Sequence, residues 1–334
     1  MRPYEVDVPV RVMLWTRPEC LKKQFEVLKK AAPSTLFLIS DGGRNEKEMA
    51  RIRESRAVFE NIDWDCKVHK LYFEENQGMY TMMKNTRELI WSTVDRCIFL
   101  EDDYVPAVSF FKFCAEMLEK YKDDERIEMI TGHNILGTYP DAEPYDYFFT
   151  QNGWSIWGTA YWKRTALGRE YPFDYADNEY IKRCIRDNTN DFWYKKVDGY
   201  CKGELVDNHV PGGEYYHAIN SLLNHRLSIV PTRNMINNIG TVGEHTNLNQ
   251  RIKGDGEFLF NMKTYEIDFP IKHPKYVIDD KCYGNIYAKK LGQIKKNICI
   301  RIYKKFKHGF IYLIHGELID AIKRKFKKKE TEEN

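Results

Sequence analysis

The most constraining feature of this sequence is a regular alternation of apolar, strand-like runs with helical patterns over its first third. Four strand-like runs lie at 8–15, 35–40, 66–73 and 96–100, and helical patterns lie between them at 19–30, 46–60 and 80–91. Strands that alternate with helices at this spacing are typical of parallel βαβ units. The sequence therefore predicts an α/β fold, Rossmann-like, with a doubly wound and mostly parallel sheet. Ligands of such sheets bind beyond the carboxyl ends of the strands.

Charge divides the 334 residues into a mildly acidic body and a strongly basic C-terminal segment. Residues 285–334 carry a formal charge of +9, so residues 1–284 carry −6 within the total of +3. We predict a folded domain over 1–284 and an α-helical extension over 285–334. Within the domain the alternation weakens after about residue 135. The aromatic or Asn/Gly-rich stretches 147–162 and 211–246 are expected to form acceptor-side or lid elements rather than a second core.

The basic segment also has an apolar pattern, because an apolar residue recurs every four positions from Ile294 to Phe326. Lysine and arginine fill the positions between, which predicts short amphipathic helices that bind an anionic membrane surface. One alternative is a helix packed on the body with a solvated lysine face. Another is a nucleic-acid-binding tail, which we disfavour because binding to phosphates does not need an apolar stripe.

The cysteines and the N-terminus indicate a compartment. The eight cysteines are scattered and form no C-x-x-C pair, which favours reduced thiols over disulfides or structural zinc. The N-terminal residues are too charged for a signal peptide, and no uncharged apolar run reaches the length of a membrane span. We expect a cytoplasmic protein that is peripherally associated with the inner face of the plasma membrane.

Three consecutive acids, Glu101, Asp102 and Asp103, end the fourth apolar run. Adjacent carboxylates repel one another, so at the end of a buried strand they need a cation or a polar ligand. Oxygen ligands of this kind favour Mg²⁺ or Mn²⁺. The alternative is a solvated acidic turn that precedes the helix expected at 109–121, where acids suit the positive end of the helix.

An apolar strand followed by Glu-Asp-Asp, Pro106 and a phenylalanine-rich helix resembles the metal-binding motif of nucleotide-sugar glycosyltransferases with the GT-A fold. The similar members are N-acetylglucosaminyltransferase I and bacterial enzymes labelled hemolytic-protein-like. Three further stretches resemble that family in the same order, and the resemblance covers about residues 8–246. They are the uridine-binding loop at 39–43, the Asn-x-Gly stretch at 76–78 with Asn85, and the Pro-x-x-Asn stretch at 230–240.

The resemblance implies roles for individual residues. Asp103 would bind the metal directly with His245, Glu101 and Asp102 would contact the ribose and metal-bound waters, and Asp41 would contact the base or the ribose. The remaining residues expected to bind the donor are Thr16, Arg17, Asn76, Gly78 and Asn85. On its sequence context alone, a loop histidine such as His245 is more often an ordinary surface residue than a metal ligand.

The catalytic base is expected to be a carboxylate that takes the proton of the acceptor hydroxyl. Glu214 lies where the resemblance places an acid, and Asp207 and Asp177 are the reserves. Glu214 also suits the first turn of a helix, which is a purely structural alternative. Trp154 and Trp157 are candidates for stacking on the acceptor sugar, and core packing explains them equally well.

The resemblance implies a metal-dependent and inverting transfer of sugar from a UDP-sugar to a glycan or lipid-linked glycan, in the synthesis of bacterial surface polysaccharide or glycoconjugate. Residues 1–135 would form the nucleotide-sugar half and residues 136–284 the acceptor half. One rival is a sugar-phosphate nucleotidyltransferase, which needs a glycine-rich loop where this chain has Thr-Arg-Pro-Glu at 16–19. The other is a non-catalytic protein that binds or disrupts membranes through its tail.

Overall fold

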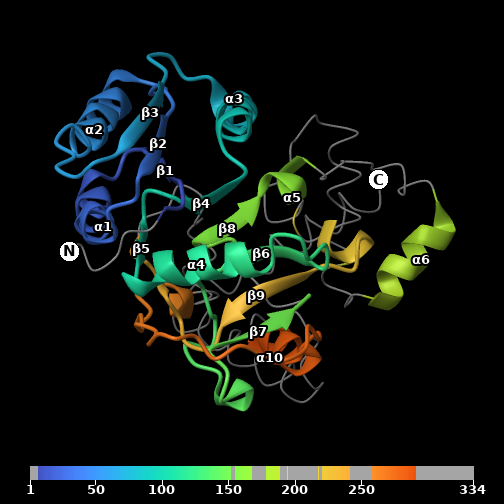
Figure 1. Ribbon diagram of the computed structural model, residues 1–334. Helices are drawn as coiled ribbons and strands as arrows, with labels where there is room; N and C mark the ends of the chain where they lie inside the picture. Colours follow the sequence, from blue (N-terminus) through green and yellow to red (C-terminus); the bar gives the residue numbers. More distant parts are fainter. Residues whose placement is uncertain are drawn as a thin grey trace, which may run out of the picture. The chain divides into compact units, whose positions relative to one another are not determined.

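The computed structural model describes residues 7–151, 155–167, 178–188, 194, 217, 220–240 and 257–290 (Figure 1). The chain divides into two compact units, Met1–Leu291 and Gly292–Asn334, and all described residues belong to the first. Residues 291–334 lie outside the described part, so the predicted amphipathic tail stays a prediction. None of the described helices combines the length and the apolar character needed to cross a bilayer.

The first part of the described chain alternates strands and helices as the sequence predicts. Its elements are β1 (Val10–Met13), α1 (Pro18–Ala31), β2 (Thr35–Ser40), α2 (Glu46–Ala57), β3 (Lys67–Tyr72), α3 (Gly78–Thr93) and β4 (Arg96–Leu100). Strand β1 pairs in parallel with β2 on one side and with β4 on the other, and β2 pairs in parallel with β3. The predicted parallel βαβ units are confirmed.

Later strands extend this sheet to eight strands in the order β3-β2-β1-β4-β8-β6-β9-β7. They are β6 (Ile127–Thr131), β7 (Tyr147–Thr150), β8 (Thr159–Trp162) and β9 (Leu227–Pro231). Strand β8 is antiparallel to β4 and β6, β6 is parallel to β9, and β7 is antiparallel to β9. The fold is the predicted α/β class with a mostly parallel sheet. The stretch 147–162, expected to form acceptor-side or lid elements, supplies the sheet strands β7 and β8, so these residues belong to the sheet and not to a lid.

Both faces of β2 are covered, which explains why this strand is apolar from Leu36 to Ile39. Leu36 and Leu38 of β2 pack in one cluster with residues of α1 and α4, whereas Phe37 and Ile39 pack in another with residues of α3. Successive side chains of a strand point to opposite faces, so a strand covered on both sides has no polar positions to spare. Helices α1 and α3 are seen on the two sides of β1 and β2 in Figure 1.

The remaining described elements lie between and after these strands. They are β5 (Tyr104–Pro106), α4 (Ser109–Lys120), η1 (Pro140–Ala142), α5 (Lys163–Leu167), α6 (Glu179–Asn188), β10 (Ile236–Asn238), η3 (Glu257–Leu259) and α10 (Lys281–Lys290). Helix α10 is anchored to the domain, because the buried Tyr283 donates its hydroxyl to Asn134 Oδ1 at 3.1 Å and Lys290 Nζ donates to the carbonyl of Ile135 at 2.9 Å.

The described cysteines carry free thiols. Two of them, Cys97 and Cys114, are fully buried in the core. Burial raises the pKa of Cys97 to about 12 and raises that of Cys114 as well, so both thiols stay protonated at neutral pH. For Cys97 and Cys114, the expectation that cysteines inside apolar runs pack as small apolar side chains is confirmed.

Candidate functional site

The strand order creates a switch point between β1 and β4. The chain passes from β1 outward to β2 and β3, and it then returns to β4 on the other side of β1. Ligands of doubly wound sheets bind beside the loops that diverge from such a point. Here the loop after β1 carries Thr16 and Arg17, and the loop after β4 carries the three acids that begin at Glu101.

Arg17 joins these two loops by contacting both aspartates. Its Nη1 donates a hydrogen bond to Asp103 Oδ2 and lies 3.3 Å from Asp102 Oδ1. The side chains of Asp102 and Asp103 are 6% and 12% exposed, and that of Arg17 is 22% exposed. Asp102 Oδ2 is buried, and none of the described residues hydrogen-bonds to it. The structure thus brings three of the predicted site residues together and leaves one carboxylate oxygen available to a ligand.

The protonation of these acids is dominated by burial. Burial raises the pKa of Asp102 to about 7, Arg17 opposes this rise, and the negative charges of Asp103 and Glu101 add to it. Burial also raises the pKa of Asp103, and Arg17 again opposes the rise. A further cation beside these carboxylates would lower both pKa values and stabilise the ionised forms.

Glu101 pairs with a second arginine, Arg11, which the sequence analysis missed. Arg11 Nη1 and Nη2 donate to Glu101 Oε1 at 2.9 and 3.0 Å, and Nη1 also donates to the carbonyl of Leu100 at 3.1 Å. The fully buried Gln24 donates to the carbonyl oxygens of Glu101 and Tyr104 at 2.7 and 2.6 Å. A signal for Arg11 was present, since a charged residue inside an apolar strand needs a buried partner.

The stretch 230–240 lies directly against the acids. Strand β10 pairs antiparallel with β5, and the N–H of Ile239 donates to the carbonyl of Asp103 at 2.9 Å. Asn238 Oδ1 accepts from the N–H of Gly240 at 2.9 Å. A Cβ atom at Gly240 would overlap Asp103 Oδ2 and would lie 2.8 Å from Arg17 Nη1. Glycine at this position therefore leaves the space that the contact between Arg17 and Asp103 occupies.

Asp41 connects the loops that follow β2 and β3. Its Oδ1 accepts from the N–H groups of Gly42 and Gln77 at 2.9 and 2.8 Å, and its Oδ2 accepts from Asn76 Nδ2 and the N–H of Gly78 at 3.2 and 3.1 Å. Gly78 has a φ of +76°, which glycine adopts at little cost. Two predicted elements are thus brought together, and the contact of Asp41 with a base or a ribose stays a prediction.

The remaining predicted site residues form two groups, those that the structure describes and those that lie outside the described part of the chain. Thr16 and Asn85 are half-buried. Trp157 packs against Tyr104, His133 and Phe260, with ring centroids 6.1, 4.8 and 5.3 Å away, which matches the core-packing alternative; its contact with an acceptor stays a prediction. The predicted residues outside the described part of the chain are Trp154, Asp177, Asp207, Glu214 and His245.

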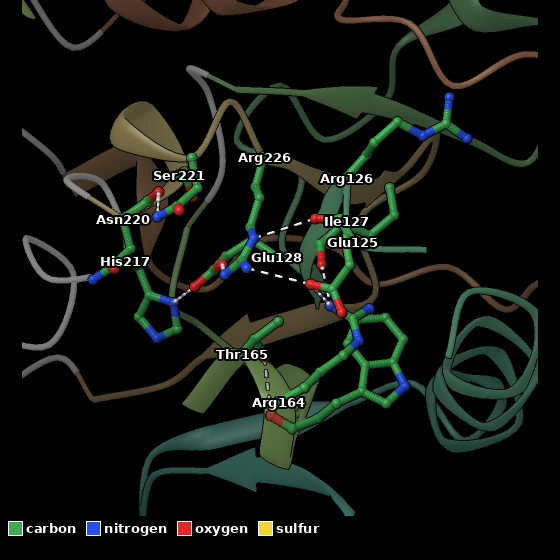
Figure 2. A network of polar contacts seen from close by, with 12 residues as sticks. Glu125, Arg126, Ile127, Glu128, Arg164, Thr165, His217, Asn220, Ser221 and Arg226 are labelled. Carbon is green, nitrogen blue, oxygen red and sulfur yellow. Dashed lines mark hydrogen bonds and ion pairs between the residues drawn. The ribbon is translucent and has the colours of Figure 1, made fainter. Parts of the chain in front are cut away.

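A second buried acid, Glu128, lies on β6 in a network that the sequence did not reveal (Figure 2). Its side chain is fully buried, and Oε2 accepts from Arg226 Nη1 at 3.3 Å while Oε1 lies 3.6 Å from His217 Nδ1. Arg226 also contacts the exposed carboxylate of Glu125 at 3.3 Å. His217 lies three residues after the predicted base Glu214 in the sequence. The contact of His217 with Glu128 therefore fixes a residue that is close in sequence to Glu214.

A hollow of about 450 Å³ lies between α1 and α2 and has mixed apolar and charged walls. Its lining residues are Pro18, Lys22, Phe25, Glu26, Glu54, Ala57 and Val58. None of the three acids after β4 lines it. The buried carboxylates, rather than this hollow, define the candidate site because ionisable groups with shifted pKa values gather at functional sites.

The donor set fits a hard divalent cation that is bound together with phosphate. Within the described residues, no three His, Cys, Asp or Glu side chains form a group that could hold a metal ion alone. Mg²⁺ is commonly held by one or two carboxylates and completes its coordination with substrate phosphates and water. Asp102, with its unpartnered buried oxygen, and Asp103 meet that requirement.

Fold and site together define an α/β protein with buried aspartates at the switch point of a mostly parallel sheet. No protein-family model matches the chain, and no curated protein matches it. Among solved structures, mouse xyloside xylosyltransferase 1 in its apo form is similar with a TM-score of 0.39 and 11% identity, covering 80% of this chain and all of that one. A cytidylyltransferase from Leptospira borgpetersenii has a TM-score of 0.29 and 10% identity, covering 79% of this chain and all of that one. At such low TM-scores the activities of those proteins do not extend to this one.

Proposed function

We propose that this protein is a divalent-metal-dependent glycosyltransferase that moves a sugar from a nucleotide sugar, most simply a UDP-sugar, to a glycan or lipid-linked glycan. The observation that carries the proposal is the contact of Arg17 with the buried Asp102 and Asp103 at the switch point between β1 and β4. Carboxylates for a cation and a guanidinium for phosphate oxygens at one place support the binding of a diphosphate.

Each group at the site has a role in this proposal. Asp103 would hold the cation directly, Asp102 and Glu101 would contact the ribose and metal-bound waters, and Arg11 keeps Glu101 in place beside them. When bound, Mn²⁺ or Mg²⁺ neutralises the charge that develops on the departing nucleoside diphosphate. Arg17 donates to phosphate oxygens, and the joined loops that contain Asp41 and Gly78 bind the nucleoside.

The acceptor side of the proposal rests on residues outside the described part of the chain. Glu214, or else Asp207 or Asp177, takes the proton of the acceptor hydroxyl, which then attacks the anomeric carbon opposite the departing diphosphate and inverts its configuration. His245 is proposed as a further metal ligand, and Trp154 and Trp157 as a surface for the acceptor sugar. We place the reaction in the synthesis of bacterial surface polysaccharide or glycoconjugate at the cytoplasmic face of the membrane.

Titration calorimetry of UDP binding, with Mn²⁺ and with EDTA, tests the proposed function. We expect Mn²⁺ to raise the affinity for UDP by about tenfold or more, which corresponds to about 1.4 kcal/mol or more of binding free energy. In a parallel assay, a UDP-sugar should release UDP, whereas UTP with a sugar 1-phosphate should release no pyrophosphate. Release of pyrophosphate would favour the nucleotidyltransferase, and equal UDP affinity in both buffers would contradict the metal role of Asp103.

Truncation after Leu291 tests the proposed membrane contact of the tail. This position keeps α10, which the described structure anchors to the domain, and removes the second compact unit. We expect the truncated chain to release UDP from the donor at an unchanged rate and to lose cosedimentation with vesicles that contain anionic lipid. A truncated chain that still sediments with these vesicles would contradict the membrane role of the tail.

A further inference from the structure

The carboxylates that would hold the cation already hold an internal positive charge, the guanidinium of Arg17. We propose that Arg17 is an exchangeable counter-cation. Without a donor, Arg17 pairs with Asp103, and when the donor binds, Arg17 transfers its hydrogen bonds to the diphosphate. As a consequence, the protein binds a free divalent cation weakly and binds it well only together with a nucleoside diphosphate. This inference rests on the proposed function, because it concerns the same site.

The charges at the site support exchange rather than simple addition of a cation. Glu101, Asp102 and Asp103 bring three negative charges when ionised, and Arg11 and Arg17 bring two positive charges. The net charge of one negative unit attracts a divalent cation weakly. A cation bound to Asp103 would lie next to the Arg17 guanidinium, which now contacts the same carboxylate. Two positive charges that share one carboxylate repel strongly where little water surrounds them.

The contacts of the two arginines show which of them can leave. Arg11 is held by Glu101, by the carbonyl of Leu100 and by the ring of Phe99, over which its guanidinium lies 5.2 Å from the centroid. Among the described residues, the side chain of Arg17 has hydrogen bonds or ion pairs only with Asp102 and Asp103. Arg17 is also twice as exposed, at 22% against 11%. Among the described residues, hydrogen bonds and ion pairs with these two aspartates alone therefore hold the Arg17 guanidinium in this place.

A diphosphate provides the alternative partner that Arg17 needs. Its oxygens can accept two hydrogen bonds from one planar guanidinium, and its charge balances that of the arginine after it leaves Asp103. Asp103 then becomes available without leaving Arg17 unpaired. The cation and the diphosphate both favour the movement of Arg17 from Asp103 to the diphosphate, so the two ligands bind with positive coupling. By thermodynamic linkage, each raises the affinity for the other by the same factor.

Calorimetry on the full-length chain and on Arg17→Gln tests this inference with Mn²⁺ alone, UDP alone and both together. Gln keeps the polar character of the side chain and removes its charge. We expect Arg17→Gln to bind Mn²⁺ alone about tenfold or more tightly than the wild type, because the repulsion and the competition are both removed. The factor by which Mn²⁺ strengthens UDP binding should fall by a similar amount in the variant.

Arg51→Gln is the matched control, because Arg51 is also paired with carboxylates, Glu19 and Glu54, but on the outer surface of α1 and α2. It changes the net charge equally and should leave both Mn²⁺ affinity and coupling unchanged. If Arg17→Gln does not fold, judged by circular dichroism, Arg17→Lys replaces it, and its single ammonium should weaken the coupling in the same direction.

The outcomes separate this inference from the proposed function. The role of Arg17 would be overturned if Arg17→Gln bound Mn²⁺ less than about threefold more tightly than Arg51→Gln does, or if the coupling between Mn²⁺ and UDP were unchanged. UDP binding to the wild type would still support the transferase in that case. If the wild type binds no UDP under any condition, the proposed function fails, whatever Arg17→Gln does with Mn²⁺ alone.

Discussion

Asp103→Asn is expected to abolish the dependence of UDP binding on Mn²⁺ and to slow donor turnover by about 10²- to 10³-fold, which is the usual effect of removing one group that stabilises developing charge. Asp103 is the acid that Arg17 hydrogen-bonds and that a Cβ atom at Gly240 would overlap. The amide keeps the shape of the side chain and loses the charge. The measurements are UDP titration with and without Mn²⁺ and the rate of UDP release from a UDP-sugar.

Asp63→Asn is the matched control for this prediction. Asp63 is half-exposed and pairs with Lys29 on the surface, so the substitution changes the same side chain and the same net charge far from β4. We expect it to leave turnover and the effect of Mn²⁺ unchanged. An Asp103→Asn protein that releases UDP as fast as Asp63→Asn does would contradict the role of Asp103.

Glu128→Ala is expected to lower the free energy of unfolding by about 3–5 kcal/mol, because it leaves Arg226 without its buried anion. The side chain of Glu128 is completely buried, whereas that of Arg226 is 14% exposed and that of His217 is 7% exposed. Removing one partner of a buried pair costs more than the pair contributes, because the remaining charge has lost its compensation. Unfolding in urea, followed by circular dichroism, measures the change.

Glu125→Ala provides the comparison within the same network. Glu125 contacts the same arginine at the same distance of 3.3 Å, but its side chain is 67% exposed. An exposed ion pair contributes at most about 1 kcal/mol, so this variant should unfold almost as the wild type does. Equal losses in the two variants would show that burial does not determine the contribution of Glu128.

The fold of the first hundred residues could be predicted because long helical patterns separate its strand-like runs, so even short strands such as β1 and β4 are delimited by their neighbours. Predicted helices and strands up to β4 match the described elements to within a few residues at their ends. Strands β7 and β8 could not be recognised, because both fall within one aromatic-rich stretch in which no helical pattern marks where each strand begins and ends. Only the strands beside them determine that these four-residue runs are extended.

The consecutive acids of the candidate site could be predicted from the residues themselves, and the resemblance added the loops that meet them, but the contacts between residues of different elements could not be predicted. The acids after β4 stand out in the sequence because charges end an apolar strand. The pairing of Arg17 with Asp103, by contrast, joins residues 86 positions apart, and that of Arg11 with Glu101 joins residues 90 positions apart. Glu128 lies between the apolar Ile127 and Met129, where alternation predicts an exposed polar side chain, so its burial could not be foreseen. Its partners Arg226 and His217 come from chain far beyond β6, so nothing near it in the sequence indicates the network.

Crystals of the full-length protein soaked with UDP and Mn²⁺, with anomalous data collected at the manganese edge, test the central claim most directly. The account predicts one manganese peak that contacts both a carboxylate oxygen of Asp103 and the diphosphate, with the Arg17 guanidinium turned onto the phosphate oxygens. A nucleotide bound away from the ends of β1 and β4, or a diphosphate bound there with manganese elsewhere and Arg17 still on Asp103, would contradict it.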